Sequence, residues 1–170
     1  MIKIFKNYLL KTEIDKLNSL ALSYLNTGLL YEGNCFGRFT TRHVNKQFKF
    51  EQFVYDIATK VRETAGVTKY PYALDRGVDG VNVAVTLNNG SVDVHKDPRS
   101  FDGKVCYRCN VITQKSEQGG ELVMNGSVVE LNVGDLHCYP ASEVEHSVTG
   151  VSGKTPRIVW MFSSYIPKES

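Results

Sequence analysis

The hydrophobic pattern changes near residue 67, and this change constrains the fold more than any other feature of the sequence. Before it, apolar residues recur every three or four positions over 11–25 and again over 50–65, as in amphipathic helices. After it, short runs that favour strands alternate with turn signals such as Asn88-Asn89-Gly90 and Asn125-Gly126. This order predicts an α+β, mainly β protein whose antiparallel sheet carries the helices on one side.

The strand-forming runs are short and closely spaced. We expect about eight strands, at residues 81–87, 91–95, 104–114, 119–124, 127–131, 136–140, 145–151 and 156–166. Such spacing is typical of a closed or two-sheet β architecture. A chain of 170 residues fits one domain, so we predict a single domain over 1–170, with a helical support region over 1–66 and a β core over 67–170.

Composition excludes several classes of protein. No apolar run approaches the roughly 20 residues of a membrane helix, and the first residues lack the features of a signal peptide, so we expect a cytoplasmic protein. The formal net charge of +2 gives no support for nucleic-acid binding, and nothing indicates an oligomeric state. The four cysteines include a single C-x-x-C pair, Cys106 and Cys109, which is too little for a structural zinc site. We expect buried, reduced thiols.

Histidine and aspartate form one pattern typical of a metal site. His95 and Asp97 stand two residues apart at a predicted strand end and therefore share a face. His146 follows about 50 residues later on another predicted strand, and His137 is its rival as a third ligand. Two histidines and one carboxylate are the usual protein ligands of non-haem Fe(II). His43 lies in a basic stretch and is expected to have no catalytic role.

Arg157 opens the last predicted strand, where apolar residues follow it. A guanidinium that enters such a strand requires an anionic partner. That partner is either a structural carboxylate, for which Glu121, Glu130 and Asp135 are candidates, or the carboxylate of a bound ligand held by the arginine fork.

These features together resemble the Fe(II)/2-oxoglutarate-dependent dioxygenase superfamily, in its prolyl-4-hydroxylase-like branch. The resemblance covers residues 91–165: the His-x-Asp pair, Gly119-Gly120-Glu121-Leu122, Tyr139-Pro140, the distal histidine and a later basic residue. It implies a double-stranded β-helix (jelly roll) core preceded by helices. It implies that His95, Asp97 and His146 bind Fe(II) and that Arg157 binds the distal carboxylate of 2-oxoglutarate. It also implies a reaction that consumes 2-oxoglutarate and O2, releases succinate and CO2, and hydroxylates a peptide side chain, such as a prolyl residue, or a small molecule.

The sequence departs from that branch in two places. Val92 stands where a tyrosine is frequent, so another residue must complete the co-substrate pocket. Asn110 and Arg108 are candidates, although pleating alone does not say which face of their strand looks inward. The interval from His146 to Arg157 is about one residue longer than is usual in that branch, which makes Lys154 a rival for the carboxylate. We favour Arg157 because a guanidinium suits a carboxylate and Lys154 lies in a predicted turn.

The stretch 36–50 interleaves aromatic and basic residues, a composition that also occurs where proteins bind single-stranded nucleic acid. We favour instead a segment whose phenylalanines pack on the jelly roll, and next a segment that shapes the substrate entrance. Two other functions stay open: a non-catalytic jelly-roll module that binds a ligand, and a cupin-type metal enzyme that does not use 2-oxoglutarate.

Overall fold

The structure, a computed structural model, describes residues 1–41 and 47–168, and within them two helices and 13 strands. The helices are α1 (Lys11–Asn26) and α2 (Gln52–Ala65). The strands are β1 (Lys3–Phe5), β2 (Tyr31–Glu32), β3 (Arg38–Thr40), β4 (Val81–Thr86), β5 (Val92–His95), β6 (Val105–Gln114), β7 (Gln118–Gly119), β8 (Leu122–Met124), β9 (Ser127–Val129), β10 (Leu136–Pro140), β11 (His146–Val148), β12 (Val151–Ser152) and β13 (Arg157–Ile166).

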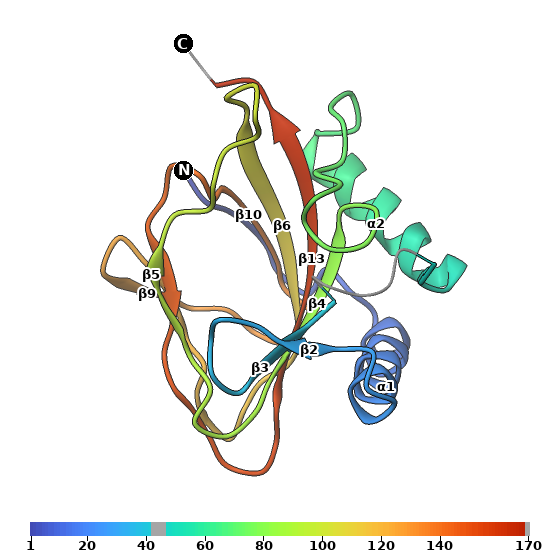
Figure 1. Cartoon of the computed structure of the whole chain (residues 1–170), viewed down its shortest axis with the longest axis vertical. Helices are drawn as coiled ribbons and strands as arrows, with labels where there is room; N and C mark the ends of the chain where they lie inside the picture. Colours follow the sequence, from blue (N-terminus) through green and yellow to red (C-terminus); the bar gives the residue numbers. More distant parts are fainter. Residues whose placement is uncertain (42–46, 169–170) are drawn as a thin grey trace.

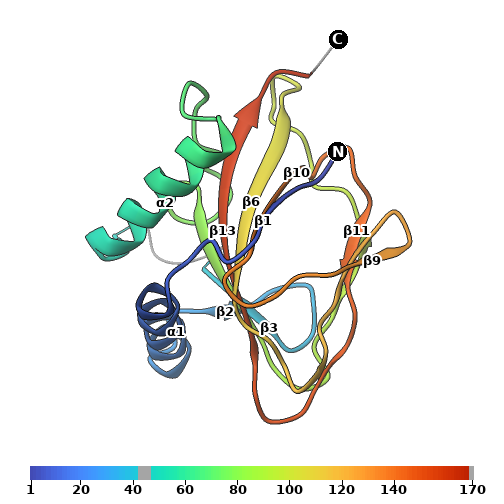
Figure 2. The same ribbon diagram turned by 180° about the vertical axis from the view of Figure 1, so that it is seen from behind.

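The strands form two main antiparallel sheets that face each other. The larger sheet has the order β1-β10-β6-β13-β4-β3-β2, and the smaller has the order β5-β11-β8-β9. A further pair, β12-β7, lies apart from both. Both helices cover the outer face of the larger sheet, and the smaller sheet lies across its inner face (Figures 1 and 2). The inner face of the larger sheet is therefore the floor of any site between the sheets.

Strand β13 illustrates how alternation divides the core into two layers. Ile158, Trp160 and Phe162 point toward the helices, while Val159 and Met161 point toward the smaller sheet. Trp160 is fully buried, and its ring lies 5.6 Å from that of Phe50. Because successive side chains of a strand point to opposite faces, one strand contributes to both layers.

Each helix contributes an apolar stripe to the outer layer of the core. In α2 the stripe consists of Val54, Ile57, Ala58 and Val61, at the three- and four-residue spacing that the sequence predicts. Burial of one such branched aliphatic side chain stabilises the fold by about 1.5–3 kcal/mol. The helix ends at Gly66, which adopts a left-handed φ of 73° and closes the last turn with its backbone N–H.

The predicted fold class is confirmed: the protein is mainly β, with two helices on one face of an antiparallel sheet. The short strands β1, β2 and β3 were not predicted, because two or three residues are too few to display an alternating pattern. The predicted strands at 119–124 and 145–151 are each broken by a turn. Within the described residues, neither helix has the length and hydropathy needed to cross a bilayer.

The cysteines match the expectation of reduced thiols. All four are free; Cys106, Cys109 and Cys138 are buried, whereas Cys35 is partly exposed. Cys106 and Cys109 point to opposite faces of β6, as their odd spacing requires, so they do not form a joint metal site.

Candidate metal centre

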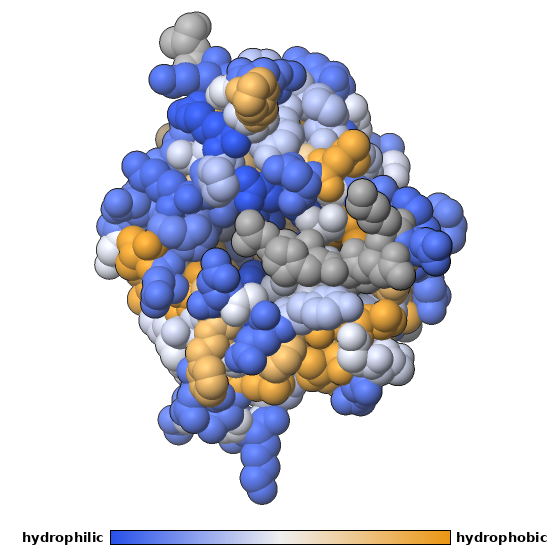
Figure 3. All heavy atoms as spheres, in the orientation of Figure 1, coloured by the Kyte–Doolittle hydropathy of each residue, from blue (hydrophilic) through white to orange (hydrophobic). Residues whose placement is uncertain are grey.

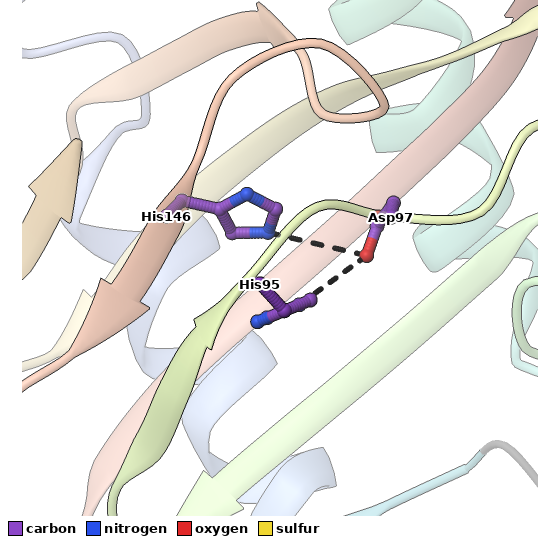
Figure 4. A group of neighbouring side chains, drawn as sticks. All are labelled: His95, Asp97 and His146. Carbon is purple, nitrogen blue, oxygen red and sulfur yellow. Dashed lines mark ion pairs between the residues drawn. The ribbon is translucent and has the colours of Figure 1, made fainter. Parts of the chain in front are cut away.

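Three side chains predicted to bind a metal lie together at the edge of the smaller sheet. His95 is the last residue of β5, Asp97 follows it in the link to β6, and His146 is the first residue of β11. His146 is the register partner of His95, so antiparallel pairing joins two residues that are far apart in sequence. The three side chains point toward one another (Figure 4).

The distances within this cluster suit a single ion. Nε2 of His95 lies 3.4 Å from Oδ1 of Asp97, and Nε2 of His146 lies 3.9 Å from the same oxygen. All three ligand atoms fall within 4.8 Å of one another. Asp97 and His146 are buried, whereas the side chain of His95 is 39% exposed, so the cluster is open on the His95 side.

Backbone hydrogen bonds fix which nitrogen of each histidine faces the centre. Nδ1 of His95 donates to the carbonyl oxygen of Asp93 at 2.8 Å, and Nδ1 of His146 donates to that of Val144 at 2.9 Å. A carbonyl only accepts, so in the neutral ring Nδ1 carries the proton and Nε2 presents a lone pair; Nε2 of His95 donates to Asp97 only when that ring is protonated. This is the arrangement of histidines prepared to bind a metal.

Asp97 is held ionised by its surroundings. Burial opposes its ionisation, but the charge of Arg108 and hydrogen bonds from His95 and Arg108 outweigh this and lower the pKa of Asp97. Nε of Arg108 donates to Oδ2 at 2.6 Å, and Sγ of Cys106 lies 3.7 Å from the same oxygen. Oδ1 is thereby left to face the two histidines. The hydrogen bond to Asp97 raises the pKa of His95, whereas burial lowers that of His146.

The cluster lies in a cavity of about 380 Å³ between the two sheets. Arg108 and Asn110 line it, whereas Tyr107, Cys109 and Val111 pack toward the helices, which settles the face of β6 that looks inward. Apolar walls complete the cavity: Val92, Leu122, Val148, Val159 and Met161. The interior is therefore partly shielded from water.

Arg157 lies in the wall of this cavity with only 7% of its surface exposed. Among the described residues no carboxylate lies within 4.0 Å of its guanidinium, although Glu121, Glu130 and Asp135 were candidate partners. Asp135 pairs instead with Lys6 at 2.8 Å. Burial, then the nearby charge of Arg38, lowers the pKa of Arg157 to about 10, which leaves it cationic at neutral pH.

The rival residues lie elsewhere. Lys154 is exposed and absent from the cavity walls. His137 lines the cavity on β10 but outside the metal cluster; burial, then the charge of Arg157, lowers its pKa to about 3. Val92 lies in the wall, and His43 lies outside the described residues.

Three polar groups on the cavity walls favour a polar ligand. Nδ1 of His137 and Oδ1 of Asn110 are buried without a hydrogen-bond partner among the described residues. Burial, opposed by Arg108, raises the pKa of Tyr139, so its phenol stays protonated and able to donate. Tyr139 stacks on His137 with ring centroids 6.0 Å apart. Buried polar atoms without partners mark places where a ligand or water must complete the hydrogen bonding.

Sequence reasoning did not assign Arg38 and Arg76 to the site, yet both line the cavity. Arg38 belongs to the stretch 36–50, whose expected roles included shaping a substrate entrance. Phe48 and Phe50 of that stretch do pack, against each other and the ring of Tyr24, whereas Phe36 is exposed. Residues 42–46 of the stretch lie outside the described residues.

Fold and cluster together define a jelly-roll protein with a 2-His-1-carboxylate centre facing a cavity, and solved structures share this fold. No family model matches the sequence, and no curated protein does. A prolyl-4-hydroxylase from Pseudomonas putida is similar with a TM-score of 0.68 and 16% identity, over 96% of this chain and 92% of that one. A Trichoplax adhaerens prolyl hydroxylase in complex with a hypoxia inducible factor peptide has a TM-score of 0.71 and 13% identity, over 96% and 83%.

A third similar structure is HygX from Streptomyces hygroscopicus with nickel, 2-oxoglutarate and hygromycin B bound. Its TM-score is 0.69 at 10% identity, over 98% of this chain and 83% of that one. The chain therefore has the fold of prolyl-4-hydroxylase-like 2-oxoglutarate oxygenases, as the sequence resemblance implies.

Proposed function

We propose that this protein is an Fe(II)- and 2-oxoglutarate-dependent dioxygenase that hydroxylates a substrate and releases succinate and CO2. The observation that carries the proposal is that one cavity contains both the His95–Asp97–His146 cluster and the buried guanidinium of Arg157, which has no carboxylate partner among the described residues. A metal centre explains the cluster, and a bound carboxylate explains the arginine.

The donor set fits iron. In this proposal Nε2 of His95, Nε2 of His146 and Oδ1 of Asp97 hold the ion on one side, which leaves positions for other ligands. When bound, the iron and 2-oxoglutarate supply the oxidation of the substrate by O2. The chain's own part is to hold the ion, orient both substrates and exclude water.

The cavity also fits 2-oxoglutarate. Arg157 binds the distal carboxylate through its fork of N–H groups, to which residues 1–41 and 47–168 offer no carboxylate partner. Tyr139 offers a phenol donor and Asn110 an amide group on the same walls. In this proposal these two groups replace the tyrosine that the resembled branch frequently has at the position of Val92. Arg108 acts on Asp97 rather than reaching for the co-substrate, since its Nε is already bonded there.

The solved relatives suggest both kinds of substrate. One holds a peptide and another holds a small molecule, hygromycin B, so the fold alone does not choose between them.

An anaerobic titration tests the proposal. Apoprotein receives Fe(II) and then 2-oxoglutarate while visible absorption is recorded. We expect a weak charge-transfer band that requires both additions. Iron binding without any response to 2-oxoglutarate would favour the cupin-type metal enzyme, and the absence of both would favour a binding module.

A further inference from the structure

Arg38 occupies a well-anchored position at the cavity wall. It is the first residue of β3 and pairs in register with Thr86 of β4, whose other register partner is Arg157 of β13. The turn before it is fixed, because the backbone N–H of Gly37 donates to Glu32 Oε1 at 2.6 Å and its carbonyl accepts from Leu87 N. Directly paired residues share a face, so the two arginines extend into the same cavity.

The two guanidiniums have different surroundings within that cavity. Nη2 of Arg38 lies 3.8 Å from Sδ of Met161, and Nη1 of Arg108 lies 3.8 Å from the same sulfur. Arg38 therefore reaches toward the arginine that holds Asp97. Cδ of Arg157 instead lies next to Gly120, where an added Cβ would approach to 2.8 Å.

The charged residues of the cavity walls are mostly arginines. The walls contain four arginines and two aspartates: Arg38, Arg76, Arg108, Arg157, Asp93 and Asp97. Arg108 is neutralised by Asp97 at 2.6 Å, and Arg76 lies 3.7 Å from Asp75. The upper part of the face seen in Figure 3 is largely hydrophilic, whereas hydrophobic residues gather in its lower part.

Arg38 and Arg157 remain without a carboxylate within 4.0 Å in the part of the chain that the structure describes. The exposed Asp93 offsets only one of these charges. A divalent ion and the 2-oxoglutarate dianion cancel each other, so the loaded cavity keeps a positive charge. Among the described residues, the five N–H donors of Arg38 have one weak acceptor, the sulfur of Met161.

We propose that the substrate of this enzyme carries a carboxylate or phosphate group, and that Arg38 binds that group. The inference rests on the proposed function, which assigns Arg157 to the co-substrate. A guanidinium suits either anion because both offer paired oxygens to its fork. The position of Arg38, between Met161 and the neighbourhood of Asp97, places the bound anion beside the metal centre.

The test uses the whole chain loaded with nickel in place of iron and with saturating 2-oxoglutarate, so that Arg157 is occupied. Calorimetry at constant ionic strength then measures binding of acetate against acetamide, and of methyl phosphate against methanol. We expect saturable binding of acetate or methyl phosphate and none of its neutral counterpart. The stronger of the two anions identifies the group as carboxylate or phosphate.

Matched variants assign the effect to a residue. Arg38→Gln should weaken binding of the anion about tenfold or more, while 2-oxoglutarate affinity changes much less. Arg157→Gln should weaken binding of 2-oxoglutarate much more than binding of the anion. Arg99→Gln removes a guanidinium that pairs with Glu143 outside the cavity, and it should change neither affinity.

Two outcomes overturn the inference. The first is that neither anion binds more tightly than its neutral counterpart, acetamide for acetate and methanol for methyl phosphate. The second is that Arg38→Gln binds the anion as tightly as the wild type does. The proposed function is judged separately by the charge-transfer band of iron and 2-oxoglutarate. A band without anion selectivity overturns this inference alone, and a missing band overturns both. A succinate-release screen of small acids, each beside its amide, then identifies the substrate.

Discussion

Nε of Arg108 donates to Oδ2 of Asp97 across 2.6 Å, while Oδ1 of the same carboxylate faces both histidines. The two oxygens thus have separate roles, and the guanidinium sets the orientation of the carboxylate. Further contacts steady Arg108 itself, since its Nη1 lies 3.2 Å from Oγ of Ser163. Such neighbours of a metal ligand tune affinity without touching the ion.

Replacing Arg108 should therefore weaken metal binding without abolishing it. We expect Arg108→Gln to bind Fe(II) about 10–100-fold less tightly, because Asp97 loses its orienting partner. Anaerobic titration of the metal measures the change, with Arg99→Gln as the control. Metal affinity equal to wild type would show that Asp97 needs no orientation by this arginine.

Loss of a ligand should have a larger effect than loss of its neighbour. We expect Asp97→Asn and His146→Ala to reduce Fe(II) affinity more than Arg108→Gln does, since each removes a donor atom from the cluster. His137→Gln is the matched control, because His137 lines the cavity outside the cluster. If His137→Gln lost the metal and His146→Ala kept it, His137 would be the third ligand.

The two basic residues near the start of β13 should differ in their effect on 2-oxoglutarate. Arg157→Gln should lower the affinity for 2-oxoglutarate about 10–100-fold, because the co-substrate loses a charged hydrogen-bonding partner, and metal affinity should be kept. Lys154→Gln should change neither, because Lys154 is exposed outside the cavity. Titration of the iron-loaded protein distinguishes them, and the opposite ranking would assign the carboxylate to Lys154.

Stability of the metal-free protein should fall in mild acid through His137. Its pKa is lowered from 6.5 to about 3, so between these values the unfolded chain binds a proton that the fold does not. Stability therefore rises with pH across this window, by about 1.4 kcal/mol per unit from this group. We expect His137→Gln to lose less stability than wild type between pH 6.5 and 4.5 in urea denaturation. Parallel losses in the two proteins would exclude His137 as the source.

The helices and long strands were predictable because their apolar patterns extend over many residues. Stripes over 11–25 and 50–65 and the run in β13 each repeat a period several times. Strands of three residues, such as β1 and β3, show no repeating pattern, and they are defined by pairing partners far along the chain. Tertiary pairing, rather than local preference, creates these strands.

The residues of the candidate site likewise include some that the sequence predicts and others that only the tertiary structure places there. His95 and Asp97 were predicted because residues two apart on a strand share a face, and His146 was chosen through the family resemblance; the structure brings the three side chains together. The place of Arg38 in the cavity wall was not predicted, because only the β3–β4 pairing brings it there. The inward face of β6 also required the structure, since its odd and even residues are both largely buried.

The alternation along β13 makes this strand sensitive to a kind of mutation that ordinary substitution scans do not sample. A deletion of one codon within it would shift every later residue to the opposite face. Trp160 and Phe162 would then enter the polar cavity, while Met161 and Ser163 would replace them beneath the helices. In-frame deletions in this segment should thus be purged by selection even where many single replacements are tolerated.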